Sequence, residues 1–248
     1  MSTNTTSVWR KKLKELEIVV VIPTYNNGKT LAAVIEEVCR YADDIIVVND
    51  GSTDDTANIL EQYPAIRTIT HPVNKGKGTA LKHGLSQAKK EGFRYAITID
   101  SDGQHFASDI PCFIEAIEKE PDTLLVGARN LASDNMPGKN TFANKFSNFW
   151  FRLETGLKLE DTQSGYRLYP LRKMDVQSCW YTAKYEFELE AIVFAAWGDV
   201  AVKNISIHVY LSPASRTGIP FPAVPGFYPY QCAEHGAGAD YLPLDCSP

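Results

Sequence analysis

The sequence predicts an α/β fold with a mostly parallel central sheet flanked by helices. Three observations support this prediction. Apolar runs rich in Val and Ile alternate along the chain with segments of helical periodicity. The runs, such as 18–23 and 45–48, are continuous, which is typical of strands buried on both faces of a parallel sheet. Polar clusters follow directly after these runs, at the carboxyl ends of strands where such sheets bind ligands.

Length and composition bound the class of protein. A chain of 248 residues can bury one sizeable core, and 44% hydrophobic with 22% charged residues is ordinary for a globular protein. The net charge of −5 argues against general nucleic-acid binding through a basic surface. We therefore expect no nucleic-acid partner.

Cysteine usage and the N-terminus point to a compartment. The five cysteines form no CxxC pair, so neither a zinc site nor a disulfide framework is indicated. Their odd number fits a reducing compartment better than an oxidising one. The N-terminus lacks the apolar core of a signal peptide, and no run of about 18 apolar residues exists to span a bilayer. We expect a cytoplasmic protein, and peripheral contact with the inner face of the plasma membrane stays open.

The elements follow from the apolar pattern. Residues 1–16 are polar and basic and are expected to form a flexible N-terminus. Strands are expected at 18–23, 45–48, 66–70, 95–99 and 124–126, and later at 200–210. Helices are expected around 31–38, 53–63, 77–90, 109–119 and 185–197. A further helical stripe, favoured as core-facing over a ligand groove, comprises Phe142, Phe146, Phe149 and Leu153.

The domain is expected to span 17–212, because the character of the chain changes afterwards. Seven of the fourteen prolines fall in 213–248, where neither helical nor strand periodicity persists. This segment is expected to be a disordered or frameshifted tail. Read one nucleotide later with free codon choice, the chain from Ser215 can encode a basic-aromatic stretch followed by an apolar one, which suits a membrane surface. If the frameshift is real, residues after 212 carry no function.

The first chemical motif is an acidic loop after the strand at 95–99. Asp100 and Asp102 are separated by one residue, so both carboxylates can turn toward one pocket where the strand gives way to a loop. A hard divalent ion takes oxygen ligands, and a diphosphate would complete its shell and share its charge. The alternative is a solvated acidic loop. The position after a strand in a nucleotide-type α/β half favours the metal site.

Two further clusters suit a nucleotide. Asp50 closes a buried strand, where its carboxylate can accept hydrogen bonds from a base or ribose, while Gly51 and Ser52 also read as a turn and a helix cap. The cationic loop 74–78 opens a helix, so its amides and lysines can meet phosphate, with a solvated turn as the alternative. The loop lacks the Gly-Lys-Ser/Thr end of a Walker loop, which argues against ATP hydrolysis.

Several motifs occur together in a fixed order. They are PTYNN (23–27), VVNDGSTDDT (47–56), NKGKG (74–78), DSDGQH (100–105), GAR (127–129) and DTQSGYRLYP (161–170). This set resembles the family 2 glycosyltransferases of the GT-A fold, the nucleotide-diphospho-sugar transferase type. The branch that it most resembles is the polyprenyl- or dolichyl-phosphate sugar synthases, and the resemblance covers roughly residues 17–210.

The resemblance implies a set of site residues. The donor nucleotide is expected to contact Pro23, Tyr25, Asn27, Asp50, Gly51, Lys77, Asp100 and Ser101. A Mg²⁺ or Mn²⁺ cofactor is expected to bind through Asp100, Asp102 and Gln104. The acceptor phosphate is expected to meet Arg129, Ser164 and Arg167, since a guanidinium contacts phosphate oxygens in two places; a surface ion pair is the alternative for either arginine.

Asp161 has more than one interpretation. In family members with sugar hydroxyl acceptors, an aspartate in this region is a general base. A phosphate acceptor is already ionised near neutral pH, so Asp161 would then orient Arg167 or the acceptor, or serve as a structural cap. We count Asp161, Arg129 and Arg167 as the candidate catalytic residues. Glu186 and Glu188 are interpreted as charges at the start of a helix.

These expectations combine into one function. The chain is expected to transfer a hexose from a UDP- or GDP-sugar to polyprenyl phosphate, with metal dependence and inversion, in the synthesis of cell-envelope glycans. Alternatives are a hydroxyl or other lipid acceptor, and an inactive truncated remnant that still binds nucleotide. A nucleotidyltransferase is disfavoured, because PTYNNGK is a poor match to the glycine-rich basic loop that would follow its first strand.

Overall fold

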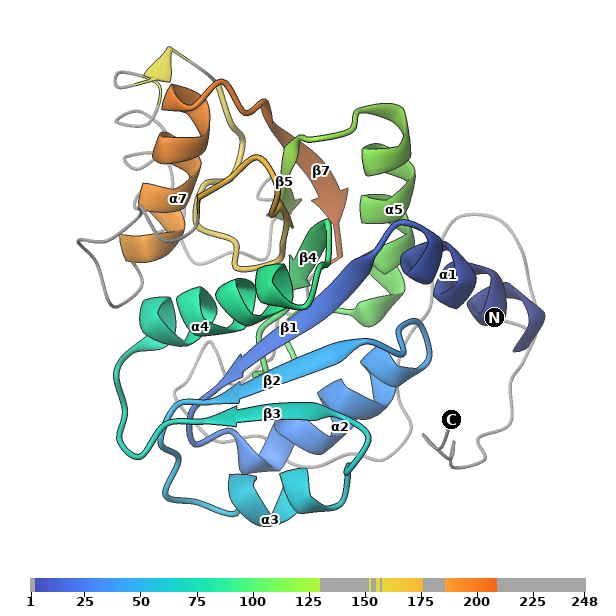
Figure 1. The fold of residues 1–248 in the computed structure, drawn as a ribbon, viewed down its shortest axis with the longest axis vertical. Helices are drawn as coiled ribbons and strands as arrows, with labels where there is room; N and C mark the ends of the chain where they lie inside the picture. Colours follow the sequence, from blue (N-terminus) through green and yellow to red (C-terminus); the bar gives the residue numbers. More distant parts are fainter. Residues whose placement is uncertain (1–2, 130–151, 153–154, 157, 176–185, 209–248) are drawn as a thin grey trace, which may run out of the picture.

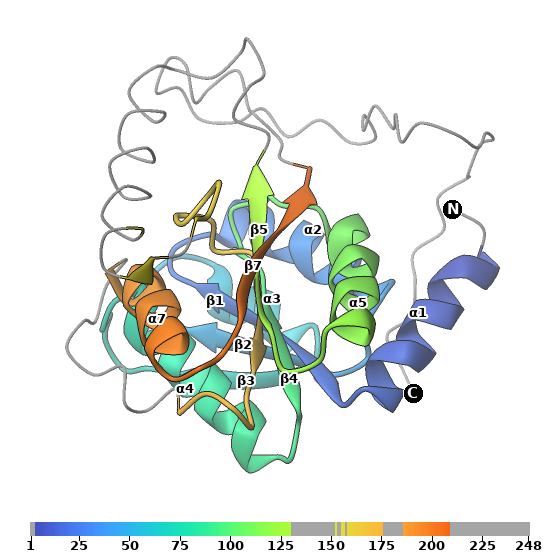
Figure 2. The ribbon, with the colours of Figure 1, turned by 90° about the horizontal axis from the view of Figure 1, so that it is seen from above.

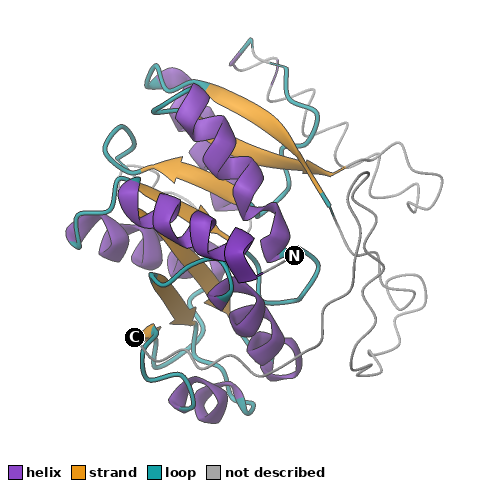
Figure 3. Cartoon of the chain, turned by 90° about the vertical axis from the view of Figure 1, so that its right-hand side faces the viewer, coloured by secondary structure: helices purple, strands orange, loops and turns teal. Residues whose placement is uncertain are grey.

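The computed structural model describes residues 3–129, 152, 155–156, 158–175 and 186–208. These residues form a sheet with helices on either side (Figures 1 and 3). The strands are β1 (Ile18–Thr24), β2 (Ile45–Asn49), β3 (Arg67–Thr70), β4 (Tyr95–Thr98), β5 (Leu124–Arg129), β6 (Arg167–Pro170) and β7 (Val202–Ile207). The helices are α1 (Thr3–Glu15), α2 (Gly28–Cys39), α3 (Thr56–Glu61), α4 (Lys77–Lys90), α5 (Ile110–Lys119) and α7 (Glu186–Trp197), with a 3₁₀ turn η1 (Ala107–Asp109) before α5.

The sheet is mostly parallel, with strand order β3-β2-β1-β4-β6-β5-β7. β1 pairs in parallel with β2 and β4, β2 with β3, and β5 with β7. β6 runs antiparallel to both of its neighbours, β4 and β5. The expectation of a mostly parallel sheet flanked by helices is therefore confirmed. Because β6 runs the other way, its first residue lies at the same edge as the last residues of the parallel strands.

Each face of the sheet has its own apolar core. Alternate residues of β1 go to opposite faces: Val20 and Ile22 join the side of α2 and α5, and Val19 and Val21 join the side of α4 and α7. Figure 2 shows α4 and α7 on one side of the sheet and α5 and α1 on the other. Burial on both faces explains why the strands are continuous Val/Ile runs. Gly84 lets α4 approach closely, because a Cβ there would lie 2.5 Å from Val21 Cγ1.

The N-terminal segment differs from the expectation. Residues 3–15 form helix α1 rather than a flexible stretch. Leu13 is 2% exposed in the core, and Trp9 and Leu16 pack against the same core. These three side chains are spaced i, i+4 and i+7, which is one helical face. The high content of Lys and Arg obscured this stripe, since the charged residues occupy the opposite face.

Other differences are local. The first turn expected at residue 53 is absent: α3 begins at Thr56, because the Asp54 carboxylate accepts the backbone N–H groups of Gly28 and Thr56 at 2.9 and 3.1 Å. β6 was not expected as a strand. The aromatic stripe from Phe142 and the tail 213–248 lie outside the described residues. In the described part of the chain, no helix is long and apolar enough to cross a membrane.

Candidate active site

The carboxyl edge of the sheet collects most of the motifs. β1 ends at Thr24, β2 at Asn49 and β4 at Thr98, and the parallel register aligns Thr24 with Asn49. The loops that follow carry Tyr25, Asp50 and Asp100 to the same edge. The loop that leads into the antiparallel strand β6 arrives there as well, since Thr98 pairs with Arg167. Motifs far apart in the sequence therefore meet at one edge, where parallel sheets bind ligands.

Asp50 is a buried organiser of the cationic loop. Its side chain is 2% exposed, and Oδ2 accepts the backbone N–H of Gly76 at 2.8 Å. Oδ1 accepts the backbone N–H of Lys75 at 2.9 Å and contacts His71 Nδ1 at 2.6 Å. Gly51 supports the same arrangement, because a Cβ on it would lie 2.4 Å from the carbonyl carbon of Val73. Asp50 and Gly51 thus fix the shape of the loop that opens α4.

His71 continues this contact toward the surface. A carboxylate oxygen accepts, so His71 Nδ1 donates in its contact with Asp50. On the other side of the ring, His71 Nε2 lies 2.7 Å from His83 Nδ1, and the two rings meet edge-on with their centroids 4.7 Å apart. Burial, then the neighbouring His71 and Lys75, lower the pKa of His83. These contacts were not predicted from the sequence, because isolated histidines carry no spacing signal.

The segment after β1 braces the acidic loop. Asn27 Nδ2 donates to Ser101 Oγ at 2.8 Å, and Thr30 Oγ1 donates to the Ser101 carbonyl at 2.6 Å. Ser101 is buried, so its hydroxyl is a structural link in this conformation. Pro23 is buried in β1, while Tyr25 is 44% exposed. Among these positions, Tyr25 is the one that presents an exposed ring at this edge of the sheet.

Asp100 forms an ion cluster with two other residues. Lys77 Nζ lies 2.7 Å from Asp100 Oδ1 and 2.9 Å from its Oδ2. The same ammonium lies 3.1 Å from Glu188 Oε1. Burial alone would raise the pKa of Asp100, but the Lys77 ammonium holds it below its ordinary value. Burial raises the pKa of Glu188, against the opposing charges of Lys77 and Arg167. Lys77 therefore joins the acidic loop to helix α7.

Asp102 is the other carboxylate of the loop. Burial, reinforced by the charge of Asp100, raises the pKa of Asp102. Its Oδ1 accepts the backbone N–H of Gln104 at 2.9 Å, and the Gln104 side chain is exposed. A carboxylate whose ionised form is disfavoured by burial and by a neighbouring carboxylate is a place where an added cation is favourable. Oxygen donors of this kind suit Mg²⁺ or Mn²⁺. The described residues hold no cluster of three or more acidic, His or Cys ligands, so phosphate oxygens and water would complete the shell.

The loop before β6 carries the candidate acceptor residues. Asp161 is 0% exposed, and its Oδ1 accepts the backbone N–H of Gln163 at 2.9 Å. Asn204 of β7 holds this loop, since its Nδ2 donates to the carbonyl groups of Val126 and Asp161, both at 3.1 Å. Ser164 is also buried, and its Oγ accepts the backbone N–H of Tyr166 at 3.3 Å. In this conformation Asp161 and Ser164 shape the loop from inside.

Arg167 is placed differently from the expectation of a guanidinium that meets phosphate. It is 0% exposed, and its Nε donates to the Ser164 carbonyl at 2.7 Å. Its other nitrogens donate to the backbone carbonyl groups of Thr162, at 3.0 Å, and Glu188. The arginine thus ties the loop to α7. Arg129 ends β5 opposite Ile207 of β7, and its side chain lies outside the described part.

Gly165 explains how closely the two loops approach. A Cβ at this position would lie 2.6 Å from Asp100 Oδ2, and 2.8 Å from both Glu188 Oε1 and Lys77 Nζ. Only glycine leaves room for the ion cluster. The Gly165 carbonyl also accepts a hydrogen bond from Thr98 Oγ1 at 2.7 Å. The backbone of the DTQSGYR motif therefore lies directly against the acidic loop.

The sequence matches the family described as glycosyl transferase family 2 over residues 19–176, more than half of the chain. The chain belongs to this family. Its relatives include a UDP-N-acetylglucosamine–dolichyl-phosphate N-acetylglucosaminyltransferase from Methanococcus voltae, 30% identical over 82% of this chain and 92% of the relative. A polyprenol monophosphomannose synthase from Mycolicibacterium smegmatis is 27% identical over 64% of each chain. The human dolichyl-phosphate beta-glucosyltransferase is 24% identical over 82% of this chain and 69% of the human one.

Solved structures support the fold. A glucosyl-3-phosphoglycerate synthase from Mycobacterium tuberculosis, solved with Mn²⁺, UDP and glucosyl-3-phosphoglycerate, has a TM-score of 0.61 to this chain. It is 19% identical, over 86% of this chain and 78% of its own. The expected GT-A fold and the expected membership of family 2 are both confirmed, and this family 2 protein is a glycosyltransferase.

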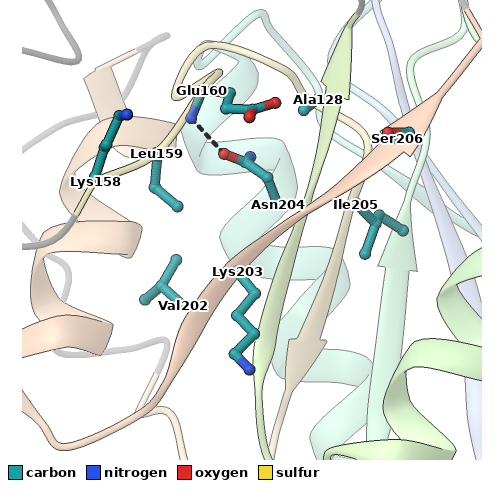
Figure 4. Close-up of a pocket in the computed structure, with 9 residues that line it drawn as sticks. All are labelled: Ala128, Lys158, Leu159, Glu160, Val202, Lys203, Asn204, Ile205 and Ser206. Carbon is teal, nitrogen blue, oxygen red and sulfur yellow. Dashed lines mark hydrogen bonds between the residues drawn. The ribbon is translucent and has the colours of Figure 1, made fainter.

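A separate cavity of about 400 Å³ opens beside the outer strands of this glycosyltransferase (Figure 4). Its lining residues are Ala128, Lys158, Leu159, Glu160, Val202, Lys203, Asn204, Ile205 and Ser206. The Glu160 backbone N–H donates to Asn204 Oδ1 at 2.6 Å along its wall. None of the ion-cluster residues lines this cavity. The Asp100 loop, with its acidic and cationic side chains, is therefore the candidate donor site rather than this hollow.

Glu188 is a functional candidate whose surroundings were not predicted from the sequence. It was interpreted, with Glu186, as a charge at the start of a helix. In the structure Glu186 is exposed, whereas Glu188 is 5% exposed and contacts Lys77. The sequence YEFELE carries one signal of this burial: acidic residues alternate with apolar ones, so the acidic residues cannot all lie on the exposed face of a helix. A glutamate on the buried face is rare unless it has a partner.

Proposed function

We propose that this glycosyltransferase transfers a hexose from a UDP- or GDP-sugar to a polyprenyl phosphate. The observation that carries the proposal is the meeting of the Asp100–Asp102 loop with the 161–167 loop across β4 and β6. One loop has the oxygen donors for a metal-bound diphosphate, and the other begins the acceptor side. The names of the relatives in M. voltae, M. smegmatis and human, all with lipid-phosphate acceptors, support the same class of acceptor.

The proposed donor site uses both carboxylates of the acidic loop. Asp100, Asp102 and the Gln104 side chain would hold Mg²⁺ or Mn²⁺. When bound, the cation would neutralise charge that grows on the departing diphosphate. Lys77 and the amides of loop 75–76 add positive charge beside the phosphates, and the exposed ring of Tyr25 would lie along the base. Pro23, Asn27, Asp50, Gly51 and Ser101 shape this pocket through the contacts described above.

The proposed reaction needs no deprotonation of the acceptor. A phosphate monoester is ionised near pH 7, so its oxygen attacks the anomeric carbon while the bond to the diphosphate oxygen breaks on the opposite face. The anomeric configuration is inverted, and the products are a polyprenyl-phosphate sugar and a nucleoside diphosphate. The buried position of Asp161, with Oδ1 engaged by Gln163, favours a positioning role over that of a base.

The acceptor side is proposed to use Arg129, Ser164 and Arg167. Arg129 stands at the carboxyl end of β5, where its guanidinium would meet the acceptor phosphate. Ser164 and Arg167 would act by holding the loop in shape, given their buried backbone contacts. A polyprenyl chain resides in a bilayer, so the enzyme would work in peripheral contact with the cytoplasmic surface of a membrane.

The test is a transfer assay with purified protein. UDP-glucose, UDP-N-acetylglucosamine and GDP-mannose are each supplied with Mn²⁺ and a short polyprenyl phosphate in detergent, and products are identified by mass spectrometry. We expect one donor to give a glycosylated lipid phosphate. Asp161→Asn should slow this transfer without abolishing it. Abolition, together with transfer to a sugar hydroxyl by the unaltered protein, would contradict the phosphate acceptor. Nucleotide binding without any turnover would indicate a remnant.

A further inference from the structure

The Lys77 ammonium is shared between carboxylates from the two halves of the site. Asp100 follows β4 in the donor half, and Glu188 lies in α7 after the acceptor loop. Lys77 Nζ lies 2.7 Å from Asp100 Oδ1 and 3.1 Å from Glu188 Oε1. Each of the three side chains is mostly buried, so the contacts are weakly screened by solvent. One cation therefore serves two anions across a short gap.

The position of Glu188 is fixed independently of Lys77. Arg167 donates to the backbone carbonyl of Glu188 and, through Nε, to that of Ser164. Gly165 presses against the cluster, with no space for a Cβ beside Glu188 Oε1. The backbone that carries the Glu188 carboxylate is thus tied to the 161–167 loop, while Lys77 reaches the cluster on a long side chain. Glu188 therefore offers the ammonium a second anion beside Asp100.

From these contacts we infer that Glu188 is a positioning residue that draws Lys77 away from Asp100 and so keeps Asp100 accessible to the donor-bound metal. This inference rests on the proposed function. An ammonium and a divalent cation compete for the same carboxylate, because each adds positive charge beside the other. Without the second anion, Lys77 would pair more fully with Asp100. With it, the ammonium has an alternative partner when the metal–diphosphate arrives.

Charge in the cluster points the same way. Lys77 carries one positive charge against Asp100, Asp102 and Glu188, which leaves the group suited to a divalent cation. Replacing Glu188 by a neutral residue takes away the second partner of Lys77 and so releases the ammonium onto Asp100. Replacing Lys77 by a neutral residue removes the competitor. The two changes are therefore expected to have opposite effects on the binding of Mn²⁺ alone.

The experiment measures binding and not turnover. Titration calorimetry with UDP and GDP in the presence of Mn²⁺ identifies the nucleotide that the unaltered protein binds. With that nucleotide, Glu188→Gln should raise the Kd of the Mn²⁺ complex about tenfold, the scale of one charged hydrogen bond. Glu186→Gln, an exposed position on the same helix, should leave Kd unchanged. Lys77→Met should tighten Mn²⁺ binding measured alone by electron paramagnetic resonance.

A double variant tests whether Glu188 acts through Lys77. In a Lys77→Met background, Glu188→Gln should change the Mn²⁺–nucleotide Kd by less than about twofold, because the cation that it positions is gone. Equal Kd values for Glu188→Gln and the unaltered protein would overturn the inference, as would the same fold-change in both backgrounds. If the unaltered protein binds neither nucleotide with Mn²⁺, the proposed function itself fails. Thermal melting shows whether each variant is folded. If the Lys77 variants do not fold, the comparison of Glu188→Gln with Glu186→Gln still tests the inference.

Discussion

Asp50 Oδ1 lies 2.6 Å from His71 Nδ1, and both side chains are buried beneath the loop that opens α4. The same carboxylate accepts the backbone N–H groups of Lys75 and Gly76. His71 thus supports the Asp50 carboxylate, and that carboxylate in turn holds the loop that opens α4.

Replacing this histidine should loosen the loop 74–78 that opens α4. His71→Leu leaves the Asp50 carboxylate without its side-chain donor, at a cost of about 1–3 kcal/mol in the free energy of unfolding. Nucleotide binding should weaken as well, since loop 75–76 loses its fixed shape. Chemical denaturation and calorimetry measure the two effects. His83→Leu is the matched control, because His83 is exposed and should cost under about 1 kcal/mol. Equal effects of both variants would contradict the role given to Asp50.

Asp102 should show opposite effects on binding and on stability. Asp102→Asn removes a proposed metal ligand, so the Mn²⁺–nucleotide Kd should rise by at least about tenfold, the scale that even indirect changes at metal sites reach. Burial and the charge of Asp100 raise the pKa of Asp102, so its ionised form is disfavoured in the folded protein. The amide should therefore melt at the same or a higher temperature at pH 7. A lower melting temperature with unchanged binding would place Asp102 outside the metal site. Asp55→Asn, at an exposed position of the Asp54–Asp55 pair, is the control.

Gly165 should be intolerant of even one methyl group. In Gly165→Ala the Cβ would collide with the Asp100 carboxylate, so the ion cluster must shift. We expect a loss of about 1–3 kcal/mol in stability, as for other overpacked sites, and a larger proportional loss of transfer activity. Denaturation and the transfer assay check this. Gly92→Asn serves as control: a Cβ there meets nothing within 4 Å, and asparagine tolerates the positive φ of this position, +92°, better than other side chains do. Full activity in Gly165→Ala would show that the cluster can be displaced without consequence.

Glu37 should make stability depend on pH near neutrality. Burial raises its pKa to about 7, against opposing hydrogen bonds from the backbone of Ala107 and Ser108. The folded state therefore favours the neutral carboxyl group. For this group, stability is highest at and below about pH 4.5, falls as the pH rises from there to about 7, and levels off above that, by a total on the order of 3 kcal/mol.

The measurement for Glu37 is a comparison of melting temperatures from pH 5 to pH 8. Glu37→Gln cannot ionise, so it should gain stability relative to the unaltered protein as the pH rises. Glu36→Gln, exposed on the same helix, should follow the unaltered protein throughout. A constant difference between Glu37→Gln and the unaltered protein across this range would rule out the raised pKa.

Much of the fold was predictable because the sheet is buried on both faces. Runs such as 18–23 and 45–48 have a single environment, so their composition alone identifies them as strands. Helix α4 was predicted at its observed bounds, because its apolar residues recur at helical spacing on one face. β6 was not predicted, because its four residues include Arg167. A charged residue in a short segment suggests a loop or a binding site, whereas this arginine is fully buried within a strand.

The site was predictable as a set of motifs but not as a set of contacts. The loops with Asp50 and Asp100 were expected at the edge of the sheet, and both lie there. The Arg167 guanidinium donates to the backbone carbonyl groups of Thr162 and Ser164. The positions of these carbonyl groups depend on the loop conformation, which no pattern of side chains reveals. The pairing of Lys77 with Glu188 joins residues more than a hundred positions apart, so it required the packing of α7 against α4.

The reversed direction of β6 has a consequence for how acceptor preference can change. β4 delivers the donor loop to one edge, and β6 begins at that edge, so the two loops meet through the sheet itself. The exposed residues of the 158–166 segment, Lys158, Glu160 and Gln163, can then change while the Asp100 loop and the start of β6 keep their register. Under the proposed function, substitutions at these positions could alter which lipid or sugar is accepted and leave the donor side intact.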